Sequence, residues 1–367
     1  MSKAADLANL IGNINAGGGG VNRNVIINGA MNVAQRGTSS TSAGGSDGYL
    51  TLDRWKTAFN SAGRLTMTQD SSAPSGFANS LKLACTTADT SVAAGEYFFL
   101  QQNIEGQNLQ GFAKGTSDAK PFAVSFWVKG NASATYVAEL YDNDNTRQIS
   151  KTFNVTTDWT RIELTYPADT TGALDDDNAK SLNLAIWLHA GTTYTSGTLN
   201  SSAWASNTNA NRAAGISSFY DSTSRTFFIT GVQLEVGQNP TEFEHEPYAT
   251  TFEKCLRYFY AVVPIGEGNA YIAPAWMYSS STLVSIIPHM TEMRSNPTVS
   301  TIDASNDFRF YRNNAADDFD EMALSSPSTR RSTAVFNATD VSGTAGHAGG
   351  IFGNDATNAY IYLTAEL

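Results

Sequence analysis

The feature that most constrains the fold is a period-two alternation of apolar residues that runs from Tyr49 to Val232. Successive side chains of a strand point to opposite faces, whereas a helix repeats every 3.6 residues. Helical periodicity is nearly absent here, and Gly, Asn and Asp turns divide the runs, so the sequence predicts an all-β sandwich or barrel. The runs include Leu65 and Met67; Leu81 and Leu83; Phe98 and Leu100; Phe122, Val124, Phe126 and Val128; Val137, Glu139 and Tyr141; Phe153 and Val155; Leu184, Ile186 and Leu188; Phe227 and Ile229.

A second, smaller β domain is expected after this stretch. The alternation breaks at 240–247, and Phe252, Leu256 and Phe259 are spaced as on one helical face, which predicts a helix within 248–261. Short apolar runs with polar turns then continue to the last residues. The chain of 367 residues also exceeds what one hydrophobic core usually supports. We therefore expect three parts: an N-terminal helix with a glycine linker (1–20), a main β domain (21–247) and a C-terminal β domain (248–367).

The N-terminal segment predicts a short amphipathic helix. Its apolar residues have the i, i+3, i+4, i+7 spacing of one helical face; they are Leu7, Leu10, Ile11 and Ile14. The pattern ends at the glycines 17–20. A helix of this length is marginal alone, so its apolar stripe needs a partner. Another subunit or a different protein of the same assembly is favoured over the body of this chain, because four glycines make a flexible joint.

Composition argues against several function classes. A net charge of -11 would repel a phosphate backbone, so nucleic acid is not expected as a partner. The sequence contains no run of 18 apolar residues, so a membrane span is not expected. Its N-terminus has no basic region followed by an apolar region, so a secretion signal is not expected either. Cys85 and Cys255 are far apart in sequence and are expected to be buried thiols rather than a disulfide.

Three groups of segments carry a resemblance to known proteins. Residues 24–37 (NVIINGAMNVAQRG), in which Asn28-Gly29 predicts a hairpin, and 52–55 (LDRW) are similar to the opening of tail fibres of tailed phages. Residues 122–129, 153–161 and 182–188 resemble strands of jelly-roll carbohydrate-binding modules. Residues 229–237, 243–248 and 255–258 resemble the stretch that links the jelly roll of the same phage proteins to a variable C-terminal domain.

The resemblance implies a jelly-roll β-sandwich in a virion protein that is released by host lysis. It implies a homotrimeric tail fibre or adhesin, with other phage tail or capsid proteins bound through the N-terminus and host-surface glycan as a ligand. The alternatives are a capsid or tail decoration (cement) protein without ligand, and a glycan depolymerase.

Catalytic motifs are missing from the sequence. His189, His245, His289 and His347 are isolated and stand in no metal-binding motif, and no nucleophile elbow or Walker loop occurs. We expect a non-enzymatic protein without a cofactor. A structural calcium ion stays open, because jelly-roll modules often hold one, and Asp175 and Asp177 are its candidates.

Sugar-binding modules present aromatic side chains on which sugar rings stack, and nearby amide and carboxylate side chains form hydrogen bonds with the sugar hydroxyls. Trp127 and Trp187 lie one step off their alternating neighbours and so face opposite Phe126 and Leu188. In a two-layer sandwich one face of a sheet is core and the other faces solvent, and either face could be the exposed one here, so both tryptophans are candidates for glycan binding. Trp204 lies in the polar loop 200–207 with Tyr194 nearby, which makes it the preferred ligand or subunit contact. The segment 343–358, rich in Gly, Ala and Asn, is expected to be a surface loop or a receptor contact.

Overall fold

The computed structural model describes residues 3–5, 7, 8, 11, 22–301, 306–324, 330–355 and 359–367. The chain divides into two compact units, an N-terminal unit (1–34, 38–248 and 367) and a C-terminal unit (35–37 and 249–366). The boundary expected from the sequence lies between residues 247 and 248. Residues 35–37 belong to the C-terminal unit because Gln35 exchanges hydrogen bonds with the backbone of Phe259 and Ala261 in that unit.

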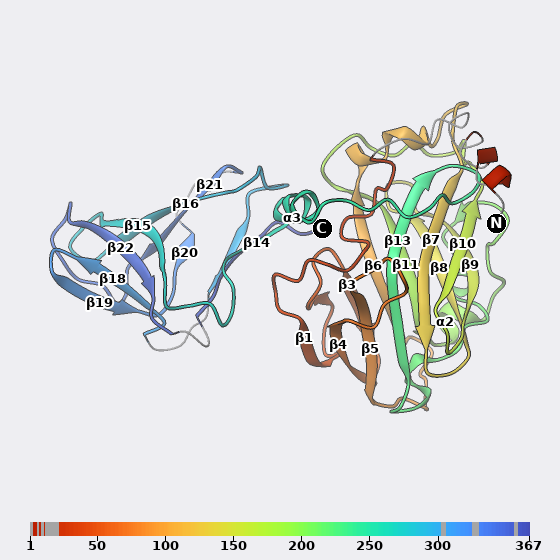
Figure 1. Cartoon of the computed structure of the whole chain (residues 1–367), viewed down its shortest axis with the longest axis horizontal. Helices are drawn as coiled ribbons and strands as arrows, with labels where there is room; N and C mark the ends of the chain where they lie inside the picture. The colour runs from red at the N-terminus through yellow and green to blue at the C-terminus, as the bar shows by residue number, and fades with distance from the viewer. Residues whose placement is uncertain are drawn as a thin grey trace. The chain divides into compact units, whose positions relative to one another are not determined.

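The N-terminal unit is a sandwich of two antiparallel sheets, which confirms the predicted all-β jelly-roll class. Its long strands run side by side, as β13, β7 and β10 do in Figure 1. The first sheet has the order β1 (Ser39–Ala43), β4 (Arg64–Asp70), β5 (Ser80–Thr87), β13 (Thr226–Val236), β7 (Phe122–Gly130), β10 (Thr160–Tyr166). The second has the order β12 (Ala205–Ser206), β9 (Arg147–Val155), β8 (Ala134–Asp142), β11 (Lys180–Ala190), β6 (Tyr97–Glu105), β3 (Lys56–Asn60), β2 (Gly48–Tyr49).

Short helical segments connect these strands: η1 (Gly106–Asn108), η2 (Gln110–Phe112), α2 (Thr192–Thr195), η3 (Asn209–Asn211) and η4 (Phe219–Asp221). Residues 3–5, 7, 8 and 11 are helical, in keeping with the expected N-terminal helix. No helix in the described part of the chain has both the length and the apolar character needed to cross a bilayer.

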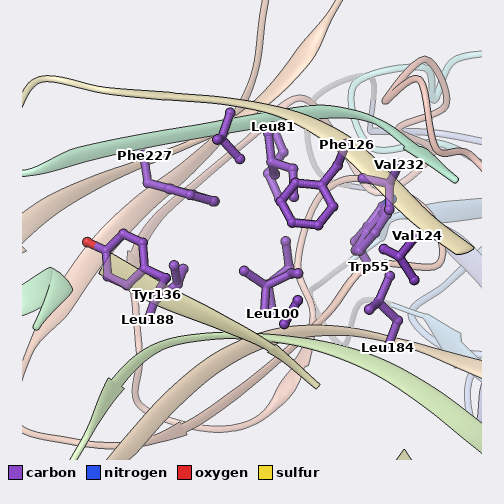
Figure 2. Close-up of a cluster of buried hydrophobic side chains, with 14 of the residues drawn as sticks. Trp55, Leu81, Leu100, Val124, Phe126, Tyr136, Leu184, Leu188, Phe227 and Val232 are labelled. Carbon is purple, nitrogen blue, oxygen red and sulfur yellow. The ribbon is translucent and has the colours of Figure 1, made fainter. Parts of the chain in front are cut away.

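The apolar residues of the alternating runs fill the space between the two sheets. In Figure 2, Leu81, Phe126, Phe227 and Val232 of the first sheet meet side chains of the second sheet. Burying a side chain of this size contributes roughly 1.5–3 kcal/mol. The labelled second-sheet residues of the close-up are Leu100, Tyr136, Leu184 and Leu188. The period-two pattern identified the core side of most strands, but in β8 the run that contains Val137 lies on the outer face, and Tyr136, Ala138 and Leu140 lie in the core.

The hairpin expected at Asn28-Gly29 is a turn without flanking strands. The Asn28 side chain accepts from the N–H groups of Asn32 and Val33 and donates to the Val33 and Asp53 carbonyls, so it ties the turn to the interior. A Cβ on Gly29 would lie 2.1 Å from the Val232 carbonyl oxygen. The segment is thus shaped by close packing on β13 rather than by strand pairing.

The C-terminal unit is a second β structure with its own core. It begins with the expected helix, α3 (Tyr248–Leu256), which ends earlier than predicted because Phe259 starts a strand. Its small sheet has the order β14 (Phe259–Val263), β23 (Ile361–Thr364), β17 (Thr298–Thr301). Its large sheet has the order β19 (Ala315–Phe319), β18 (Phe308–Arg312), β22 (Ala348–Gly353), β15 (Tyr271–Met277), β16 (Leu283–Pro288), β21 (Ser332–Asn337), β20 (Ala323–Leu324).

Cys85 and Cys255 are both buried and form no disulfide, as expected. Cys85 lies in the N-terminal unit and Cys255 in the C-terminal unit. Burial raises the pKa of the Cys85 thiol, which keeps it protonated and unreactive.

Candidate binding surfaces

An aromatic cluster lies on the outer face of the second sheet. Phe99, Trp187 and Val137 are register partners, so they share the face opposite to the core. Tyr194 of α2 packs on Trp187 with ring centroids 5.3 Å apart, and Tyr97 lies 5.6 Å from Tyr194. The structure thus brings together two residues that the sequence singled out, Trp187 and Tyr194.

The segment 191–218, here called the covering segment, crosses this face. Its Arg212 makes two hydrogen bonds of 2.8 Å to the buried Glu139 carboxylate, which also accepts one from the Trp187 indole nitrogen. Arg212 also lies 4.9 Å from the centre of the Trp187 ring. Trp187 is only 1% exposed, so its ring anchors the covering segment and is closed to a ligand. The prediction that it presents a stacking surface is wrong.

Trp204 is also buried, contrary to the prediction that it lies open in a polar loop. Its side chain is 7% exposed and belongs to the core of the N-terminal unit. The indole nitrogen donates to the Pro167 carbonyl, and the ring lies 5.4 Å from Phe122. The loop folds inward because Ala205 and Ser206 pair with β9 as β12.

Trp127 lies on the outer face of the first sheet and is half-buried. It faces away from Phe126, as its position in the alternation predicted. Gly231 has a φ of 63° at a bulge in β13, and a Cβ there would lie 2.7 Å from Phe77 and 3.0 Å from Trp127. The two rings therefore close over the bulge, and Trp127 lies apart from Trp187 and Trp204.

The calcium candidates stand outside the one cluster of potential metal-ligating side chains that the described residues contain. Asp175 and Asp177 are exposed, and the Asp177 carboxylate accepts from the backbone N–H of Ala179. Neither belongs to a group of three potential metal ligands among the described residues.

The N-terminal stripe is partly described. Leu7 and Ile11 are 57% and 49% exposed, which leaves the apolar face open for the predicted oligomer or virion contact. Leu10 and Ile14 lie outside the described residues.

A second aromatic cluster, on the C-terminal unit, is much more exposed. Tyr271 of β15, Tyr311 of β18 and Phe352 of β22 lie with ring centroids 5.3–6.1 Å apart. Tyr271 is 70% exposed, and the other two rings are half-buried. We call these three residues the aromatic triad. They lie on the face of the large sheet opposite to Ile351 and Phe310, which are in the core.

One glycine of β22, Gly350, lies beneath the aromatic triad. A Cβ on Gly350 would lie 3.1 Å from the Tyr271 ring, so this glycine allows the ring to lie close to the backbone. A Cβ on Gly349 would lie 1.9 Å from the Tyr311 carbonyl oxygen, so Gly349 allows β22 to pack closely on β18. Residues 348–353 of the segment 343–358 thus form no plain surface loop, because they are β22 in the middle of the large sheet.

A hollow of about 480 Å³ lies beside the triad. Tyr311 is part of its wall, and the remaining wall is the β18–β19 hairpin and the start of β22. Asn313 and Asn314 both have positive φ, which suits the two-residue turn of a hairpin, and both are exposed. The lining residues are Tyr311, Arg312, Asn313, Asn314, Ala315, Ala316, Ala348 and Gly349.

Charge at this surface is paired. Arg312 lies 2.7 Å from Asp317, and Arg309 donates to Asp318 at 2.9 Å. The hydrogen bond from Arg309 is the main reason that the pKa of Asp318 is lowered. The surface therefore offers aromatic faces, amides and neutralised ion pairs, which suits an uncharged polar ligand better than a strongly charged one.

The aromatic triad was not predicted from the sequence, although the positions of its residues in the alternating pattern indicate an outward face. Tyr311 and Phe352 stand one step off the core residues Phe310 and Ile351, and the same parity rule placed Trp127 and Trp187 correctly on the faces opposite to Phe126 and Leu188. The rule gives the face of a residue but not whether another segment covers that face.

No protein-family model matches the sequence, and no curated protein matches it. The solved structures that it resembles include a family 4 carbohydrate-binding module (12% identity, 57% of this chain and 97% of that chain, TM-score 0.29). A family 11 carbohydrate-binding module from Clostridium thermocellum, in complex with a mixed-linked tetrasaccharide, is similar at 10% identity (57% and 99%, TM-score 0.27). The enzymatically active domain of bacteriophage CBA120 tailspike protein 4 is similar at 13% identity (58% and 21%, TM-score 0.30). These similarities to solved structures concern the fold alone.

Proposed function

We propose that this chain is a non-enzymatic virion structural protein that acts as an adhesin and binds host-surface glycan through the aromatic triad of its C-terminal unit. The observation that carries the proposal is the gathering of the exposed Tyr271 with the half-exposed Tyr311 and Phe352, beside a hollow bordered by Asn313 and Asn314. Large aromatic side chains that gather on a soluble surface usually mark a binding site.

The chemistry of this surface suits a sugar. A pyranose has an apolar C–H face that can stack on an aromatic ring, and hydroxyl groups that need donors and acceptors. The triad supplies rings at different tilts, with interplanar angles of 55° and 75°, so a chain of sugar units can contact more than one ring. The Asn313 and Asn314 amides each supply both donors and an acceptor.

The outer face of the second sheet is the weaker candidate. Gln101 and Asn183 bond to each other there, and Trp187 is closed by the covering segment. Tyr97, Phe99 and Tyr194 remain half-exposed at its margin. Burial raises the pKa of Tyr97, so its hydroxyl stays a neutral donor at physiological pH.

The test is a glycan array probed with the full chain and with Tyr271→Ala and Tyr311→Ala variants. Each substitution is expected to weaken binding about tenfold, since loss of an aromatic contact costs on the order of 1 kcal/mol. Tyr278→Ala is the matched control, because Tyr278 is 73% exposed in the same unit but outside the triad. Binding that survives in both triad variants but is lost in Tyr194→Ala would move the site to the second sheet.

The remaining parts of the proposal rest on the sequence resemblance. They are a homotrimer, attachment to phage tail or capsid proteins through Leu7, Leu10, Ile11 and Ile14, and a location on the virion. A particle reconstruction separates a fibre, whose C-terminal unit lies far from the shell, from a decoration protein. Incubation with host polysaccharide, followed by a reducing-end assay, separates both from a depolymerase, and we expect no new ends.

A further inference from the structure

A histidine and two carboxylates meet at one end of the N-terminal unit. Asp89 follows β5, Glu96 precedes β6 and His189 lies near the end of β11. One potential ligand atom from each lies within 4.8 Å of the others, and His189 Nε2 is 3.8 Å from Glu96 Oε2. His189 stands isolated in the sequence, because its neighbours in space are far away along the chain.

The histidine is held in an orientation that aims Nε2 at the carboxylates. Its ring is completely buried, and Nδ1 lies 2.8 Å from the Ser218 hydroxyl. Ser218 is itself fixed, since its oxygen accepts from the backbone N–H of Tyr220. Among the described residues, no hydrogen-bond partner lies within reach of Nε2. A buried polar atom without a partner is costly, which points to a ligand at this position.

The carboxylates are also fixed by their surroundings. Asp89 accepts from the Ser61 hydroxyl and the Ala62 backbone N–H. Burial alone would raise the pKa of Asp89, but these hydrogen bonds outweigh it and the pKa is lowered, so the group is ionised at neutral pH. Glu96 accepts from the Ala93 backbone N–H at 2.7 Å. Hydrogen bonds of this kind orient metal ligands in proteins.

The backbone holds these segments close together. The Gly191 N–H donates to the Glu96 carbonyl at 2.8 Å, and a Cβ on Gly191 would lie 2.0 Å from the Ala93 carbonyl oxygen. The Asp89 N–H donates to the Tyr220 carbonyl at 2.8 Å. The end of β11, the loop before β6 and the loop after β5 are therefore packed as one structure, and the three side chains are built into it.

We propose that Asp89, Glu96 and His189 form a binding site for a divalent transition-metal ion such as Zn²⁺. One imidazole nitrogen and two carboxylate oxygens are a usual set of zinc ligands, whereas calcium prefers oxygen ligands alone. Tetrahedral zinc with bonds of about 2.1 Å holds its ligand atoms about 3.4 Å apart. The three atoms lie within 4.8 Å of one another, so ion binding would draw them together by up to roughly 1.4 Å. The ion would join three chain segments and stabilise this end of the sandwich.

The test uses the full chain, stripped with a chelator and then titrated with Zn²⁺. We expect about one ion per chain in the N-terminal unit and a rise in Tm of about 5 °C when free zinc exceeds the Kd about 100-fold. Co²⁺ in place of zinc should give a visible absorption band. His189→Gln and Glu96→Gln should each weaken binding at least roughly tenfold.

His245→Gln is the matched control, because His245 is exposed in the same unit and outside the site. Glu96→Gln keeps the shape of the side chain and its acceptor for Ala93, so its Tm without metal shows whether the fold is intact. The proposal is overturned if the wild-type chain binds no more zinc than His189→Gln, or if Glu96→Gln and His189→Gln bind zinc as tightly as His245→Gln does.

Discussion

At the scale of single residues, a buried group of charges holds one corner of the N-terminal unit. Lys114 is completely buried and contacts Asp142 and Asp169, and Arg147 donates to Asp169 at 2.8 Å. Lys114 also lies 5.2 Å from the centre of the Trp204 ring. This arrangement explains why Trp204 is drawn inward, since its ring covers a cation that has no access to water.

Removing the Asp169 charge should destabilise the protein in a pH-dependent way. Burial would raise the pKa of Asp169, but the hydrogen bond from Arg147 and the charge of Lys114 outweigh it and lower the pKa below the ordinary 3.8. The carboxylate therefore stabilises the fold above about pH 4, and this contribution is lost as the pH falls through the lowered pKa. Asp169→Asn should cost about 3 kcal/mol at pH 7, because it leaves a buried cation with less compensation.

Urea unfolding of wild type and Asp169→Asn at pH 7, 5 and 3 checks this. The difference in unfolding free energy should shrink at the lowest pH. Asp118→Asn, at an exposed position, serves as the control. A difference that stays constant over the whole range would contradict the assignment.

At the scale of elements, the covering segment behaves as a third layer on part of the second sheet. It is fastened by the Arg212–Glu139 pair and by the contacts of Tyr194 with Trp187. Loops usually run over a surface with few buried contacts. This one is different, because Ala213 is completely buried and Leu199 and Ile216 pack around it.

Arg212→Met should loosen the covering segment. The substitution leaves the Glu139 charge buried with only the Trp187 indole as a side-chain donor, and we expect a cost of about 3 kcal/mol. Hydrogen exchange within 191–218 should become faster, while exchange in β7 and β13 changes little. The double variant Glu139→Gln with Arg212→Met should recover part of the loss, since no unpaired charge then remains.

The same element shows how far sequence reasoning reaches. The strands were predictable because alternation follows from backbone geometry, and so was the orientation of Trp127 and Trp187 opposite to Phe126 and Leu188. Alternation alone left open which of the two faces is the core. The burial of Trp187 was not predictable, since residues 191–218 have no periodic pattern and their position depends on contacts that are long-range in sequence, such as the Arg212–Glu139 pair. Trp204 was misassigned for a similar reason, because its neighbours Pro167 and Phe122 are distant in sequence.

At the scale of the whole molecule, each unit has a separate hydrophobic core. The core of the N-terminal unit includes Phe126, and that of the C-terminal unit includes Phe310. The expectation of two β domains came from length and from the break at 240–247. The sequence could not show that residues 35–37 belong with the second unit, since this depends on hydrogen bonds between Gln35 and β14.

Two cores predict two unfolding transitions. Phe126→Ala should lower one transition in a calorimetric scan, and Phe310→Ala the other, each by about 3–5 kcal/mol in stability. Both side chains are fully buried, so the two variants are matched in chemistry and burial. A single transition that both variants lower equally would show that the units unfold together.

The glycine beneath Tyr271 has a consequence for how this protein can change over time. The Tyr271 ring lies against a backbone that carries no side chain of its own at Gly350. Exchanging Tyr271 or Tyr311 alters the outer surface while Ile351 and Phe310, on the opposite face, keep their packing. A new side chain at Gly350, in contrast, would push against the Tyr271 ring. The C-terminal unit thus combines a fixed frame with replaceable outer side chains, so the binding preference that we propose for it can diverge between relatives without a new fold.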